Sequence, residues 1–260
     1  MMPEPRQADR NALARWSVQA VLLMLRGLGS WGGLMLLLCL AIFAGQHFPL
    51  VAGVLALSAF FASVIVAARM DQSRPARLGE VLESVRVHGR RILRFAGLIA
   101  CTGAVVWVLL LARPDVSWWN VFYTDRNTVA VLSADWFMAT RQLFVYAAYA
   151  LGLCYFGLNI PGLTSFFQFP CVAILGLPFR EAYRHSAAAQ MRNLGPMLGI
   201  GFTFIVLPGL AILVAPYLVP LLFCFLGALT WVAFREIFLG IRDNAAVERV
   251  RATAEGTARA

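Results

Sequence analysis

Lysine is absent from this chain of 260 residues, and all 22 of its basic side chains are arginine. The absence of lysine excludes Schiff-base chemistry and the lysine of the phosphate-binding P-loop. Charge of either sign is also scarce. Charged residues make up 13% of the chain and apolar residues 60%, against about 25% and about 45–50% in a soluble domain. The composition excludes an ordinary soluble globular domain and leaves a polytopic membrane protein.

The residues that usually carry chemistry are few. Five cysteines are too few for a disulfide scaffold, and none stands in a CxxC pair. The sequence has no GxSxG and no HExxH motif. No Asp, Glu or Arg lies inside a predicted span, whereas intramembrane enzymes and ion-coupled transporters need ionisable groups at depth. We therefore expect no catalytic residue, no metal site, no cofactor and no enzymatic activity.

Long uncharged stretches dominate the sequence. Residues 27–68 and 193–234 each run for 42 residues without Asp, Glu or Arg, enough for two helices of about 20 residues each. A break that contains proline divides each stretch into a helical hairpin. The predicted fold class is all-α, a polytopic transmembrane helix bundle with interfacial amphipathic helices. Its spans are expected at about 27–48, 50–68, 95–112, 142–179 (broken), 193–215 and 216–234.

The arginines distinguish between one and two crossings of 142–179, which its length leaves open. Arginine gathers in the loops on the cytoplasmic side of a membrane. One crossing gives six spans with 19 arginines inside and three outside, whereas two crossings give seven spans and a split of 11 to 11. The uneven split is the usual signature. We predict a cytoplasmic segment at 1–26, a transmembrane domain at 27–240 and a cytoplasmic tail at 241–260, in a bacterial inner membrane.

Residues 78–94 have the pattern of an amphipathic helix. Apolar side chains share one face, and Arg86, Arg90 and Arg94, four residues apart, form a ridge on another. Like charges at this spacing repel one another, and lipid phosphates at the cytoplasmic face would relieve that repulsion. We predict that the three arginines contact anionic lipid headgroups, with a merely solvated face as the alternative. No nucleic-acid partner is expected, because no reading motif is present.

Two further features bear on function. The predicted outer loop, 113–141, is rich in aromatic residues, which indicates contact with the membrane or the bundle, or a surface for a periplasmic protein partner. The fourth span contains polar residues and helix breakers that would line a path if the protein transported a small molecule. These residues are Asn159, Pro161, Gln168 and Pro170. A proline kink packed against neighbouring helices is the simpler interpretation.

Two glycine pairs have the GxxxG spacing that lets membrane helices approach closely. They are Gly29 with Gly33 and Gly195 with Gly199.

A degenerate pattern at about 165–200 resembles that of a known group of proteins. It consists of Phe169-Pro170, Leu177-Pro178-Phe179-Arg180-Glu181-Ala182, Ser186 and Arg192-Asn193. The pattern is similar to that of uncharacterised six-span bacterial inner-membrane proteins that resemble the membrane module of some glycerophosphodiester phosphodiesterases. The resemblance implies an all-helical six-span fold. It carries over no catalytic residue, since the phosphodiesterase activity of that family belongs to a separate soluble domain.

The sequence thus predicts an integral inner-membrane protein without enzymatic activity, a scaffold or subunit of an envelope process that contacts anionic lipid. The alternative is a transporter or channel for a small or lipid-like molecule.

Overall fold

All regular structure in the described part of the chain is helical, which confirms the all-α class. The computed structural model describes residues 4–9, 11–26, 28–45, 49–72, 78–111, 159, 165–214 and 218–241. The elements are α1 (Ala12–Leu25), α2 (Leu28–Gly45), α3 (Pro49–Gln72), α4 (Leu78–Leu111), α8 (Gln168–Ala173), α9 (Phe179–Arg192), α10 (Leu194–Val214), α11 (Val219–Phe234) and a π-helical turn, η2 (Arg235–Leu239). The predicted outer loop, most of 142–179 and the tail beyond Ile241 lie outside these residues.

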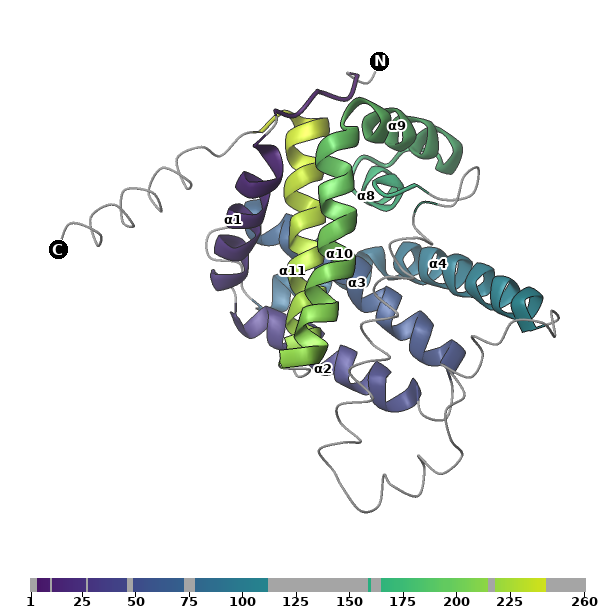
Figure 1. Ribbon diagram of the computed structural model, residues 1–260. Helices are drawn as coiled ribbons and strands as arrows, with labels where there is room; N and C mark the ends of the chain where they lie inside the picture. The colour runs from purple at the N-terminus through teal and green to yellow at the C-terminus, as the bar shows by residue number, and fades with distance from the viewer. Residues whose placement is uncertain are drawn as a thin grey trace.

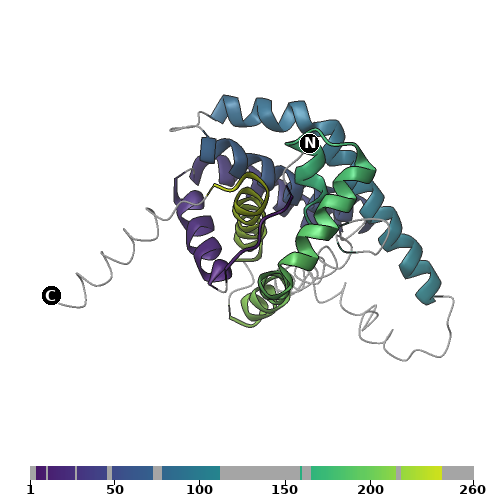
Figure 2. The ribbon, with the colours of Figure 1, turned by 90° about the horizontal axis from the view of Figure 1, so that it is seen from above.

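Helix α11 forms the centre of the bundle. It stands beside α10 with α1 on its other flank, and α3 crosses behind it (Figure 1). Seen from above, α11 is enclosed by α1, α3 and α10 (Figure 2). Its side chains are apolar on every face, and Phe223, Leu226, Trp231 and Phe234 are all buried. A helix that is apolar all round can only be stable in such a position, whether in a core or in a membrane.

The first predicted hairpin is present as α2 and α3. Helix α3 begins at Pro49, where a missing N–H costs nothing because the first helical donors have no partner in any case. Helix α4 joins the predicted amphipathic segment 78–94 and the predicted span 95–112 into one helix of 34 residues, about 51 Å long. No proline separates the two parts, so nothing in the sequence ends the helix between them.

The segment from 165 to 214 folds as three consecutive helices. Between α8 and α9 the chain turns at Gly176, whose φ of 68° lies in the left-handed region that favours glycine. Helix α9 then lies across the end of α10 (Figure 1). Phe169 of α8 packs against Phe61 of α3 and Phe95 of α4, with ring centroids 4.4 Å and 5.4 Å apart. These aromatic contacts hold α8 against the α3–α4 pair.

Two stretches of the described residues are long and apolar enough to cross a membrane. They are Val54–Asp71 in α3 and Pro220–Leu239 in α11 and η2, with mean hydropathies of 1.8 and 1.7. Shorter apolar stretches lie at Ala12–Leu25, Trp31–Leu40 and Leu194–Phe204. The described helices therefore include two candidate spans, and the count of six stays a prediction.

Candidate functional site

A buried ion pair joins the ends of α3 and α11. The Arg235 Nη1 donates to both carboxylate oxygens of Asp71 at 2.7 Å. Trp231, one turn earlier on α11, donates from Nε1 to Asp71 at 3.1 Å, and Arg235 Nη2 donates to Gln19 of α1 at 3.1 Å. The two charged side chains are only 7% and 15% exposed. A cavity of about 10 Å³ beside Arg235, Gln19 and Asp71 has room for one water molecule.

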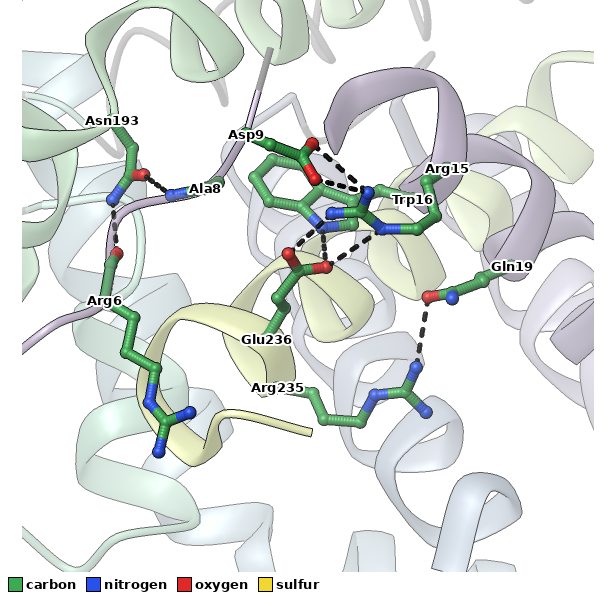
Figure 3. A network of polar contacts seen from close by, with 9 residues as sticks. All are labelled: Arg6, Ala8, Asp9, Arg15, Trp16, Gln19, Asn193, Arg235 and Glu236. Carbon is green, nitrogen blue, oxygen red and sulfur yellow. Dashed lines mark hydrogen bonds and ion pairs between the residues drawn. The ribbon is translucent and has the colours of Figure 1, made fainter. Parts of the chain in front are cut away.

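A second ion pair lies beside the first and joins α1 to η2. Arg15 donates from Nη2 to Glu236 Oε1 at 2.6 Å and from Nε to Oε2 at 3.3 Å. Trp16 adds a bond from its indole Nε1 to Glu236 at 2.9 Å, and Asp9 accepts from Arg15 at 2.8 Å (Figure 3). The arrangement repeats that of the first pair, because each carboxylate accepts from one arginine and one tryptophan.

We refer to Asp9, Arg15, Asp71, Arg235 and Glu236 together as the ion-pair cluster. Burial disfavours the charged form of Arg15, but the hydrogen bonds and charges of Asp9 and Glu236 outweigh it, so the pKa of Arg15 is raised above its ordinary value. Each arginine faces a carboxylate in a close, charge-assisted geometry. Such closed pairs suit a structural junction between helix ends. Within the described ranges no three His, Cys, Asp or Glu side chains converge as metal ligands.

The N-terminal residues 4–9, which we call the strap, run from the α9–α10 junction to α1. Asn193 Oδ1 accepts from the backbone N–H of Ala8 at 2.6 Å, and Asn193 Nδ2 donates to the carbonyl of Arg6 at 3.0 Å (Figure 3). The N–H of Arg6 donates to the carbonyl of Ile237 in η2 at 2.9 Å. The strap therefore connects the α9–α10 junction to η2 at the end of α11.

Gly240 ends η2 directly beneath the strap. Its φ of 69° is left-handed, and a Cβ atom there would lie 2.2 Å from the Arg6 guanidinium carbon. Glycine at this position thus serves two purposes, since it permits the helix-ending turn and leaves room for Arg6. The guanidinium lies at the negative end of the helix dipole, where a cation is favoured.

The predicted headgroup ligands Arg86, Arg90 and Arg94 lie exposed on the first half of α4. Arg86 is 84% exposed and pairs loosely with Glu83 at 3.6 Å. Two apolar neighbours on α4 are exposed as well, Val87 at 69% and Leu93 at 59%. This half of α4 therefore presents cationic and apolar groups together to its surroundings, as interfacial helices do.

A different pair of side chains anchors α4 to the bundle. His88 Nε2 and Arg91 Nη1 both contact the carbonyl of Ala173, at 3.1 Å and 2.9 Å. Ala173 is the last residue of α8, and its carbonyl has no partner within that helix. Arg91 thus caps α8, while the arginines of the ridge face outward.

The predicted path residues are engaged in local hydrogen bonds where the structure describes them. Gln168 is fully buried, accepts from the N–H of Ser165 at 3.2 Å and donates to the carbonyl of Phe179 at 3.0 Å. Asn159 accepts from the amide of Gln190 on α9. Pro170 is buried in α8, and Pro161 lies outside the described residues. The structure thus brings Asn159 and Gln168 into contact with α9, at Gln190 and Phe179.

The ion-pair cluster was not predicted from the sequence, and Asn193 was noted only as part of the Arg192-Asn193 pair, without a role. Asp71 follows the uncharged stretch 27–68 by three residues, and Arg235 and Glu236 directly follow the stretch 193–234. Their positions at the ends of apolar stretches were the available signal. The pairing of the charged residues could not be predicted from the sequence, because the partners lie 164 and 221 positions apart.

No protein-family model, curated protein or solved structure matches this chain. The fold and the cluster define an all-helical protein whose helix ends are joined by buried ion pairs.

Proposed function

We propose that the protein is a six-span integral protein of the bacterial inner membrane with both termini in the cytoplasm. In this proposal it has no enzymatic activity and serves as a scaffold or subunit of an envelope process, in contact with anionic lipid. The resemblance of residues 165–200 to six-span membrane proteins is in keeping with this role. The observation that carries the proposal is the pairing of charges between segments predicted to lie on the same, cytoplasmic side of the membrane.

Three ion pairs link the four arginine-rich segments that the six-span arrangement places inside. Glu4 pairs with Arg192 at 2.6 Å, Arg15 with Glu236 at 2.6 Å, and Asp71 with Arg235 at 2.7 Å. Partners this close cannot be on opposite sides of a hydrocarbon core about 30 Å thick. Seven spans would separate residues 180–192 and the tail from the N-terminal segment. The pairs of Arg192 and Glu236 with that segment therefore favour six.

Lipid contact is supported by exposed side chains on two helices. Arg86, Arg90 and Arg94 supply the positive charge on α4. On α10, Leu194, Leu198 and Phe202 follow one another at four-residue spacing and are 54%, 64% and 67% exposed. A continuous apolar stripe is costly in water and favourable against acyl chains.

The topology prediction is tested with reporter fusions in bacterial cells. Fusions that end after Asn193 and at the C-terminus should both report cytoplasm, because an even number of spans returns the chain to the side of its N-terminus. A fusion at Trp119 in the outer loop serves as the opposite control and should report periplasm. A periplasmic signal from either of the first two fusions would contradict the six-span proposal.

The lipid prediction concerns the full chain carrying Arg86→Gln, Arg90→Gln and Arg94→Gln. Each arginine near an anionic surface contributes about 1 kcal/mol, so the triple variant should lose about tenfold or more of its preference for phosphatidylglycerol. The measurement is the amount of phosphatidylglycerol retained against phosphatidylcholine by purified protein in mixed micelles. The matched control replaces the same three residues by lysine, which keeps the charge. An unchanged preference in the glutamine variant would remove the headgroup assignment.

A further inference from the structure

The strap is held mainly through its backbone. Four groups of its main chain are bonded: the carbonyl of Pro5 to Arg192 at 3.1 Å, the N–H and carbonyl of Arg6, and the N–H of Ala8. An interaction made by main-chain groups does not depend on side-chain identity. The groups that hold the strap could therefore bind other extended segments through the same main-chain hydrogen bonds.

Asn193 is the central residue of this position. Its side chain is 2% exposed, and it offers one acceptor and one donor to strap groups two residues apart. A neighbouring β-strand presents the same pair of groups to an extended chain. The second hydrogen of Asn193 Nδ2 bonds the carbonyl of Ala189 at 2.9 Å, which holds the amide in place.

The side chains of the strap divide into two sets. Pro5 is buried and Ala8 half-buried, whereas Glu4, Arg6 and Gln7 are exposed. The one long side chain with a partner on α9 is Glu4, which meets Arg192 at the surface. A cavity of about 240 Å³ lies between the strap and η2, lined by Arg6, Gln7, Ala8, Glu236, Ile237 and Gly240. A different peptide segment therefore fits in place of the strap if it has small residues at the positions that Pro5 and Ala8 occupy.

We propose that Asn193, Arg192 and the Ile237 carbonyl form a binding site for an extended peptide segment of a partner protein, with an acidic residue facing Arg192. The chain's own strap occupies the site as an intramolecular ligand, and the partner segment binds when the strap is displaced. This inference rests on the proposed role as a subunit and names the kind of partner that the subunit engages.

The short connection between the strap and α1 makes the strap a strong competitor of any separate peptide for this site. Only Asp9, Arg10 and Asn11 separate Ala8 from the first residue of α1. A short tether gives an effective concentration in the millimolar range, so a free peptide at micromolar concentration cannot compete with an intact strap. Weakening the strap is therefore the condition for binding in trans.

The experiment uses the full chain with Ala8→Pro, which removes the N–H that Asn193 accepts. The probe is a fluorescein-labelled peptide of residues 1–8, and fluorescence anisotropy in detergent micelles gives its Kd. The variant should bind the peptide about tenfold or more tightly than the unsubstituted chain does, because one strap bond is lost and Asn193 is left unsatisfied. Gln7→Pro is the matched control, since the Gln7 N–H has no partner among the described residues, and it should behave as the unsubstituted chain.

Backbone methylation of the peptide tests the recognition itself without altering the protein. N-methylation at Arg6 or Ala8 should weaken binding to the Ala8→Pro chain about tenfold or more, whereas N-methylation at Gln7 should leave it within about twofold. Equal binding to the substituted and unsubstituted chains, or equal affinity of all three methylated peptides, would overturn the inference. The assay contains no anionic lipid, so its failure is distinct from a failure of the topology or lipid tests.

Discussion

Replacing Asp71 by alanine should lower the free energy of unfolding by about 3–5 kcal/mol, the cost typical of breaking a buried ion pair from one side. The substitution leaves the Arg235 guanidinium, 7% exposed, without the carboxylate that neutralises it. It also removes the acceptor of the Trp231 indole. Thermal and denaturant unfolding of the purified chain in detergent micelles, followed by circular dichroism, measures the loss.

The matched control is Glu83→Ala on α4. Glu83 also pairs with an arginine, but the two side chains are 62% and 84% exposed and 3.6 Å apart. Because solvent screens such a pair, we expect almost no change in stability. A loss for Asp71→Ala no larger than that for Glu83→Ala would contradict the role given to the ion-pair cluster.

The double variant Asp71→Leu with Arg235→Leu distinguishes the stabilisation by the ion pair from the cost of leaving one buried charge unpaired. Removing both charges leaves no uncompensated ion, so this chain should be more stable than Asp71→Ala by about 2 kcal/mol or more. A double-mutant cycle with Asp71→Leu and Arg235→Leu gives the coupling energy of the pair.

Substitution of Gly227 should have the second large effect, because α11 and α3 touch at this residue. An added Cβ atom would lie 1.6 Å from Oγ and 2.7 Å from Cβ of Ser63, and 3.3 Å from the Ser63 backbone carbon. Rotation of the hydroxyl relieves the first contact and cannot relieve the others. Gly227→Ala should therefore force the helices apart and lower the unfolding free energy by about 1–3 kcal/mol, measured as above.

Two further variants make this prediction specific. Ser63→Gly in the Gly227→Ala chain removes the opposing Cβ, so stability should recover in large part. Gly195→Ala on α10 meets no atom within 4 Å, and it should leave stability unchanged or raise it by up to about 1 kcal/mol. A Gly227→Ala chain as stable as Gly195→Ala would show that the two helices do not need this contact.

The glycines illustrate why part of the fold could not be predicted. The GxxxG pairs drew attention to Gly29, Gly33, Gly195 and Gly199. An added Cβ would meet nothing at the first three and a flexible leucine, Leu13, at the fourth. The tight contact is at Gly227, which stands in neither pair. Spacing along one helix does not say which face meets a neighbour, so a glycine motif alone cannot locate a helix crossing.

Helix α4 shows the same limit for element boundaries. The switch from amphipathic to apolar sequence near residue 95 predicted two elements, an interfacial helix and a span. The backbone continues without interruption, because a change in hydrophobic pattern alters what surrounds a helix and not its hydrogen bonds. Only residues that break those bonds end a helix, as the left-handed Gly240 does at η2.

Hydropathy and periodicity, which are local properties, were sufficient for the all-α class and for helices close to the bounds of α2, α3, α10 and α11. The uneven distribution of arginine was also present in the sequence alone, and with it the predicted orientation. Only the tertiary structure decided that Arg15 and Arg235 lie in buried pairs, that Arg91 caps α8, and that Asn193 holds the strap. These roles depend on atoms 2.6–3.3 Å apart that belong to residues as many as 221 positions distant in the chain. No local pattern specifies such pairs, since each forms only when separate helix ends are packed together.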